Sequence, residues 1–231
     1  MRSTADNYKF RKPGDVPLEA YHEAQELEKR FIEIDRLLYE LMQRPTLKLS
    51  PREHYGMGML RARTKVNRIL AGGCLYSEAT ALDRFLDQFE EIYAICKYIM
   101  QSDRGDRRLF SVSFDEGLLH PLYFAVTNCR DSRLRHACMA MLKRLPSLEG
   151  IWHVEAMTRA AESCIKFEEA MCEIKTPRCS DIPEWRRIHS AGFDGWSFPQ
   201  SNTSTSVTAH FRVRPNGMDG DWMDVEQLIE W

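Results

Sequence analysis

The sequence lacks several patterns that would point directly to a function. It contains no apolar run near the about 20 residues that a membrane span needs, and its first residues, MRSTADNYKFRKPGD, hold no apolar core as long as that of a signal peptide. It also lacks a charge excess, since 32 Lys and Arg stand against 34 Asp and Glu. These absences predict an intracellular protein, nuclear or cytoplasmic, that does not bind membranes or nucleic acids through its overall charge.

Closely spaced cysteine pairs are missing as well. A structural zinc site usually takes its ligands from such pairs, so the sequence predicts no metal ion. Cys129, beside Arg130, is a candidate nucleophilic thiol, but a buried structural cysteine is favoured because most of the cysteines lie among apolar residues at helical spacing. The seven cysteines are Cys74, Cys96, Cys129, Cys138, Cys164, Cys172 and Cys179.

A glycine-rich phosphate loop is also absent. The segment AGGCLYSE lacks the Lys-Ser/Thr ending of a P-loop, and no GxGxxG occurs. No cofactor is therefore predicted. Two basic runs, residues 61–68 and 129–144, could contact phosphate, but solvated helix faces are favoured because acidic segments elsewhere balance their charge.

The sequence does contain strong helical periodicity, with apolar residues three and four positions apart. Ser50, followed by Pro51 and Glu53, predicts an N-cap, and Asp131 occupies another capping position. Residues 102–117 are predicted as a polar loop. The predicted helices cover residues 18–43, with the stripe Leu27, Phe31, Ile34, Leu38 and Leu41, and residues 51–71, 77–100, 117–128, 132–145 and 151–171.

After Pro177 the pattern changes. Residues around Trp185 fit a short helix, residues 206–214 alternate as a strand does, and residues 222–231 return as its partner. Because an isolated hairpin is marginal, it must pack on the helices. The predicted fold is all-α, a multi-helix antiparallel bundle with a small C-terminal β-hairpin. Its predicted parts are a flexible segment (residues 1–17), a helical domain (residues 18–190), and the loop and hairpin packed on the helices (residues 191–231).

Polar residues on otherwise apolar helix faces are the candidates for chemistry, because a catalytic cavity needs acids, bases or hydrogen-bond donors that a plain core excludes. We expect a cavity between the helices predicted over residues 117–128 and 151–171. Structural roles for these polar residues are the alternative. Candidate catalytic residues are His120, Tyr123 and His153, and candidate ligand-binding residues are His120, Tyr123, Asn128 and Trp152.

The stretch GLLHPLYFAVTNCRDSRLRHACMAMLKRLPSLEGIW, followed by MTRAAESCIKFEE and IPEWRRIHS, resembles the C-terminal part of the regulatory domain of fungal zinc binuclear cluster transcription factors. In that family an apolar helix ends in a CRD-like triplet, an Arg-rich helix follows, and an EG-[IVL]-W turn leads into a long helix. The triplet stands here at residues 129–131 and the turn at residues 149–152. The resemblance spans residues 30–231 and implies an all-α fold with a C-terminal hairpin.

The resemblance also implies structural roles for the same residues. Asp131 would cap a helix, Arg130 and Arg135 would tie helix ends or acidic neighbours, and Trp152 would anchor a turn in the core. The family's cluster of six cysteines is missing from this chain, so we expect no sequence-specific DNA binding. The earlier helices of the family's domain are missing too, which suggests either a fragment or a separate protein.

Two functions are compatible with these observations. The favoured one is a non-DNA-binding regulatory module that senses an apolar small molecule or pairs with a protein partner or a second copy. The alternative is a cofactor-independent cyclase or isomerase of fungal secondary metabolism, which would hold an apolar substrate in a helical cavity. The 11 Met residues and the aromatic share of 10% permit such a cavity, but a helical core uses the same side chains.

Overall fold

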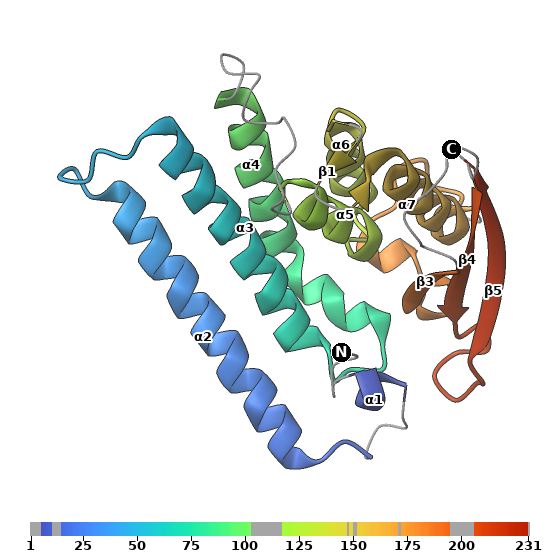
Figure 1. Ribbon diagram of the computed structural model, residues 1–231. Helices are drawn as coiled ribbons and strands as arrows, with labels where there is room; N and C mark the ends of the chain where they lie inside the picture. The colour runs from blue at the N-terminus through green and yellow to red at the C-terminus, as the bar shows by residue number, and fades with distance from the viewer. Residues whose placement is uncertain are drawn as a thin grey trace. The chain divides into compact units, whose positions relative to one another are not determined.

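The computed structural model describes residues 6–10, 15–102, 117–146, 148–149, 152–170, 172–194 and 206–230. This part of the chain is mostly helical and carries a small three-stranded antiparallel sheet near its C-terminal end (Figure 1). None of its helices is both long enough and apolar enough to cross a membrane. The chain divides into two compact units, one of residues 1–77 and 84–105, the other of residues 78–83 and 106–231.

The first unit is a set of three long helices in which the middle helix contacts both others (Figure 1). The predicted N-cap at Ser50 is confirmed, because its hydroxyl accepts a hydrogen bond from the Glu53 backbone while the Glu53 carboxylate accepts one from the Ser50 backbone at 2.7 Å. The elements are the short α1 (Asp6–Lys9) and the long α2 (Leu18–Gln43), α3 (Pro51–Gly73) and α4 (Leu86–Ser102).

The core of the first unit lies between α3 and α4, where Ala62, Val66 and Ile69 of α3 and Ile92 and Cys96 of α4 are fully buried. By contrast, no residue of α2 is buried. Its contacts with α3 are partly ionic, since the Asp35 carboxylate lies 3.0 Å from Arg61 and 2.7 Å from Lys65. The apolar stripe predicted for α2 is therefore only partly covered.

The helix predicted over residues 77–100 is divided in two. Its first part is a 3-10 segment, η1 (Ala79–Phe85), and the α-helix begins only at Leu86. The Glu184 carboxylate accepts hydrogen bonds from the backbone of Ala79 and Thr80 at 2.8 and 2.9 Å. The start of this segment thus depends on a residue distant in sequence, which local periodicity does not reveal.

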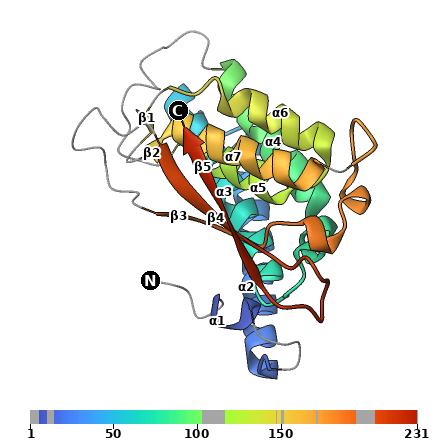
Figure 2. The same cartoon turned by 90° about the vertical axis from the view of Figure 1, so that its right-hand side faces the viewer.

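In the second unit three helices pack together beside the sheet (Figure 2). The helix predicted from residue 117 begins at Leu119, and Pro121 lies in its first turn, where a backbone N–H has no partner within the helix. Its helices are α5 (Leu119–Asn128), α6 (Ser132–Leu142) and α7 (Val154–Glu169), and the 3-10 turns are η3 (Cys179–Asp181) and η4 (Glu184–Arg186).

The predicted hairpin is confirmed as β4 (Ser206–Val213) and β5 (Met223–Glu230), but the sheet contains a third strand that the sequence pattern did not predict. β3 (Ser190–Asp194) pairs antiparallel with the other edge of β4. The sequence of β3, SAGFD, has little intrinsic strand preference, so its state follows from pairing with β4. Alternate side chains of β4, among them Phe211, are buried in a cluster with Cys164 of α7.

A second, minimal pair of strands precedes α7. β1 (Leu148–Glu149) pairs antiparallel with β2 (Trp152–His153), so the predicted turn at residues 149–152 joins two short strands. The α7 helix begins at Val154, three residues later than predicted. The predicted loop over residues 102–117 lies outside the described residues except at its two ends. Of the segment predicted as flexible over residues 1–17, residues 6–10 and 15–17 are described, and they include the short helix α1.

Candidate functional site

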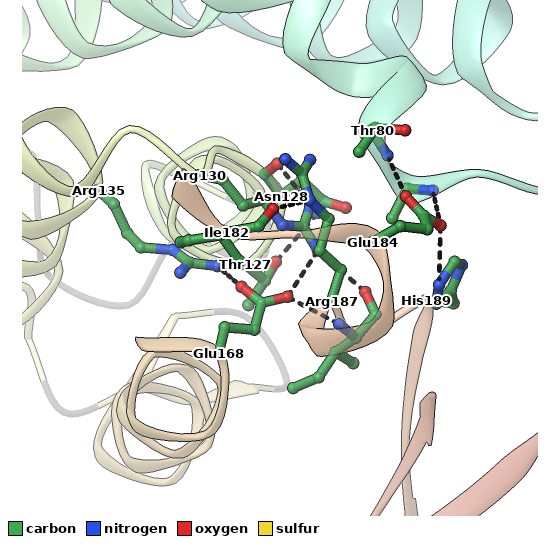
Figure 3. A network of polar contacts seen from close by, with 12 residues as sticks. Thr80, Thr127, Asn128, Arg130, Arg135, Glu168, Ile182, Glu184, Arg187 and His189 are labelled. Atoms are coloured by element: carbon green, nitrogen blue, oxygen red, sulfur yellow. Dashed lines mark hydrogen bonds and ion pairs between the residues drawn. The ribbon is translucent and has the colours of Figure 1, made fainter. Parts of the chain in front are cut away.

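The most distinctive polar feature of the second unit is Glu168, whose side chain in the last turn of α7 is fully buried. One carboxylate oxygen accepts hydrogen bonds from Arg130 Nη2 at 2.9 Å and from the Ile188 backbone at 2.8 Å. The other accepts from Arg135 Nη2. Figure 3 shows the two arginines reaching this carboxylate from different segments. A single glutamate therefore joins α7, α6, the α5–α6 junction and the chain before β3.

The two arginines also bind backbone carbonyls. Arg130 donates to the Asn128 oxygen at 2.6 Å, and Arg135 donates to the Val126 oxygen at 2.7 Å. Both carbonyls belong to the last turn of α5, where helix oxygens lack partners within the helix and carry partial negative charge. The prediction that Arg130 and Arg135 tie helix ends and acidic neighbours is confirmed.

The charges of this network compensate one another. Burial alone would raise the pKa of Glu168, but Arg130, Arg135 and the hydrogen bond from the Ile188 backbone lower that pKa to about 2. Glu169 adds a second carboxylate, 3.5 Å from Arg135 Nη1. Two guanidinium groups and two carboxylates thus balance one another in a cluster that is buried except for part of the Glu169 side chain, which reduces the cost of burying each charge.

A third buried arginine, Arg187, lies in the same unit. Arg187 binds both carboxylate oxygens of Asp83, at 2.6 and 2.8 Å, in the two-pronged geometry that suits a guanidinium. It also donates to the backbone oxygens of Ile182 at 2.8 Å and Cys179 at 2.6 Å. Arg187 thereby holds the irregular segment around η3 against the end of η1.

Glu184 completes this arrangement. Its carboxylate lies 3.1 Å from His189 Nε2 and also accepts the two backbone hydrogen bonds of η1 (Figure 3). Burial alone would raise the pKa of Glu184, but His189 and the two backbone N–H groups lower it to about 2. Glu184 is therefore ionised at neutral pH and fixed on three sides.

Two cysteines adjoin this network, since Cys129 precedes Arg130 in the chain and the Cys179 oxygen accepts a hydrogen bond from Arg187. The Cys129 thiol hydrogen-bonds to the Cys179 sulfur, which raises the pKa of Cys129 and lowers that of Cys179. Cys129 is buried and Cys179 is half-buried. The candidate nucleophile of the sequence, Cys129, therefore has a raised pKa, whereas a reactive cysteine needs a lowered one.

The predicted site residues form hydrogen bonds mainly within their own helices. Asn128 donates to the Phe124 oxygen at 3.0 Å, and His153 Nδ1 caps α7 by accepting from the Ala156 backbone at 3.4 Å. His120 and Asn128 lie at opposite ends of α5, about 12 Å apart along the helix axis. The structure thus does not bring these two residues together.

Two further candidates occupy other positions. Tyr123 packs against the apolar cluster formed by α7 and the sheet, and its burial raises the pKa of its phenol above the ordinary value. Trp152 lies in β2, where its backbone pairs with Glu149. The cavity expected between α5 and α7 stays a prediction.

Sequence reasoning did not identify Glu168, Glu184 and Arg187 as site residues. A signal for Glu168 was present, because a glutamate at helical spacing on the apolar face of α7 requires a buried cation. Glu184 and Arg187 lie in irregular structure, where no periodicity marks an inward position. Their roles depend on partners from η1, about 100 residues earlier in the chain.

The Glu168 network is suited to hold segments together, since its groups are buried and its charges are paired. Within the described ranges, no three His, Cys, Asp or Glu side chains are placed to hold a metal ion. The chain matches no protein-family model, no curated protein and no solved structure.

Proposed function

We propose that the protein is a regulatory module without a DNA-binding element, which acts by pairing through α2 with a second copy of the chain. The observation that carries this proposal is that α2, a helix of 26 residues, has no buried residue although it bears an apolar stripe. The resemblance of the sequence to a regulatory domain of fungal transcription factors supports the same functional class.

The stripe is continuous along α2. Leu27, Ile34 and Leu37 expose 46%, 42% and 50% of their surface, and the partly covered Phe31, Leu38 and Leu41 extend the same side of the helix. Leu27, Ile34 and Leu41 recur every seven residues, which is the spacing of a two-helix seam. An exposed apolar stripe of this kind marks an interaction surface.

Charge complementarity supports a second copy as the occupant. In an antiparallel pair centred on Ile34, Leu27 faces Leu41 of the second copy, and Glu23 lies opposite the end of the second copy's α2, next to its C-cap Arg44. Glu23 and Arg44 are both exposed and form no ion pair with other described residues. A parallel pair would place each of these charges against its own kind, which is unfavourable.

The oligomeric state tests this proposal. Light scattering coupled to size-exclusion chromatography should give twice the chain mass of 27.0 kDa at micromolar concentration. Ile34→Glu should yield a monomer, because it places two like charges at the centre of the seam. Ile32→Glu is the matched control, since Ile32 is also 42% exposed but lies on the other flank of α2, and it should leave the dimer intact.

A charge exchange tests the orientation. Glu23→Arg should weaken the dimer by repulsion from Arg44, and adding Arg44→Glu should restore it. A parent protein that remains monomeric at tens of micromolar, or an Ile32→Glu variant that dissociates as readily as Ile34→Glu, would contradict pairing through this stripe. Circular dichroism of each variant confirms that the helices have formed.

The alternative enzymatic function gains no support from the placement of its residues. It requires His120, Tyr123 and His153 to converge on one cavity. His153 instead uses Nδ1 to cap α7, and Tyr123 packs into the apolar cluster. We therefore propose no catalytic activity.

A further inference from the structure

We propose that the open edge of β5 is a docking site for an extended peptide segment of a partner protein, in which basic and apolar residues alternate on one face. β5 pairs with β4 on one side, and no described segment pairs with its other side (Figure 1). This surface is independent of the pairing proposed for α2, because β5 belongs to the second unit and α2 to the first.

The edge of β5 has the length and regularity that an added strand needs. All 8 residues of β5 pair with β4 in an uninterrupted register, and its sequence, MDVEQLIE, contains neither proline nor glycine. Natural edge strands are often blunted by short length, proline or a bulge, because their open backbone N–H and C=O groups pair readily with another chain. β3, at the opposite edge, has only 5 residues. β5 is therefore the better template.

The inner side of β5 is fixed by tertiary contacts. Ile229 lies in the apolar cluster with Phe211 of β4 and Cys164 of α7, and Val225 packs against the same cluster. These contacts hold the strand extended before any peptide arrives. Binding therefore has to order the peptide alone, which lowers its entropic cost.

The outer side of β5 carries the charges. Side chains alternate between the two faces of a strand, so Asp224, Glu226, Leu228 and Glu230 point away from the cluster. Arg212 binds both oxygens of Asp224 at 2.8 Å. Glu226 keeps 72% of its side-chain surface exposed, and the exposed Glu230 forms no ion pair with another described residue. Two accessible carboxylates thus flank Leu228, which is 61% exposed.

These charges select the occupant of the edge. Antiparallel pairing of β5 with its own copy about Glu226, Gln227 or Leu228 would place acidic side chains opposite each other, which is unfavourable. A segment with Lys or Arg opposite Glu226 and Glu230, and an apolar residue opposite Leu228, complements all three positions. The partner strand therefore has cations at its first and fifth positions and an apolar residue at its third.

Fluorescence anisotropy with the labelled peptide TKVLVKT tests the site. We expect binding in the micromolar range that weakens as salt is added, because the ion pairs lie at the surface. The peptide TEVLVET has the same length and apolar residues, and it should not bind.

Backbone pairing is tested by two N-methylated forms of TKVLVKT, one methylated at both valines and one at the leucine and both lysines. Alternate amides of an added strand face β5, so only one of the two forms should lose binding. Binding by both forms would show attraction of charge alone, and binding by neither would show that a paired strand is not formed. Either result would overturn the proposal.

Protein variants locate the site. Glu226→Lys combined with Glu230→Lys should weaken the binding of TKVLVKT about tenfold and should allow TEVLVET to bind. Glu155→Lys changes an exposed carboxylate on α7 and should bind TKVLVKT as the parent does. Circular dichroism confirms that each variant is folded. Failure of the folded parent to bind TKVLVKT, or an equal loss in Glu155→Lys, would contradict docking at β5.

Discussion

Arg130 donates a hydrogen bond of 2.9 Å to the carboxylate of Glu168, and both side chains are buried. Because Arg135 binds the second oxygen of the same carboxylate, removal of Glu168 would leave two cations without their main counter-ion. A pair of charges buried in this way contributes little net stability, but breaking it leaves an uncompensated charge in a water-excluded site. Glu168 is therefore the residue whose loss should affect the second unit most.

We expect Glu168→Gln to lower the free energy of unfolding by about 3–5 kcal/mol, the usual cost of removing one partner of a buried pair. The matched control is Glu155→Gln on the same helix, where the exposed carboxylate lies 3.9 Å from Arg159. It should cost less than about 1 kcal/mol. Urea unfolding followed by circular dichroism measures both, and equal costs would contradict the role of the buried network.

The stability of the second unit should fall in acid. The pKa of Glu168 is about 2 in the folded chain against an ordinary value of 4.5, and that of Glu184 is lowered in the same way. A depressed pKa means that the unfolded chain takes up protons first as the pH falls. The contribution of each group is therefore complete above about pH 4.5 and is lost progressively toward pH 2.

Melting temperatures at pH 7, 4 and 3 check this expectation. Glutamine does not titrate, so the difference in melting temperature between the parent and Glu168→Gln should be largest at pH 7 and shrink toward pH 3. A difference that stays constant over this range would mean that Glu168 is not ionised in the folded chain.

Asp131 should stabilise α6 by capping it, because its Oδ1 accepts from the Leu134 backbone at 3.0 Å. Asp131→Ala is expected to cost about 0.5–2 kcal/mol in the free energy of unfolding. Asp131→Asn keeps an acceptor at the same position and should cost much less. If chemical denaturation finds alanine and asparagine equally damaging, capping is not the main contribution of this side chain.

Two glycines of α3 should respond oppositely to alanine. A Cβ at Gly72 would lie 2.4 Å from the buried ring of Phe85, so Gly72→Ala should destabilise the first unit by about 1–3 kcal/mol. At Gly56 a Cβ meets nothing within 4 Å, and Gly56→Ala should stabilise the helix by about 0.5–1 kcal/mol. Thermal melting distinguishes the two, and destabilisation by both variants would show that the space around Gly56 is needed.

The sequence by itself determined the local elements whose signals lie within a few residues. The bounds of α2, the caps at Ser50 and Asp131, and the pairing of β4 with β5 follow from helical or alternating periods and from capping side chains. These signals act over one helical turn or one hairpin, so they can be recognised in the sequence alone.

Only the tertiary structure decided which groups meet over long separations. Glu168 stands at helical spacing with the buried residues of α7, but its arginine partners and the Ile188 backbone come from other segments. The third strand and the start of η1 likewise depend on hydrogen bonds between distant residues.

The candidate site was predicted least well, for a related reason. The sequence shows that His153 and Asn128 are polar residues at the ends of apolar helices. It does not show that their hydrogen bonds go to their own helices. The spacing of apolar residues shows which side chains share one face of a helix or strand. The tertiary fold decides which segments cover that face.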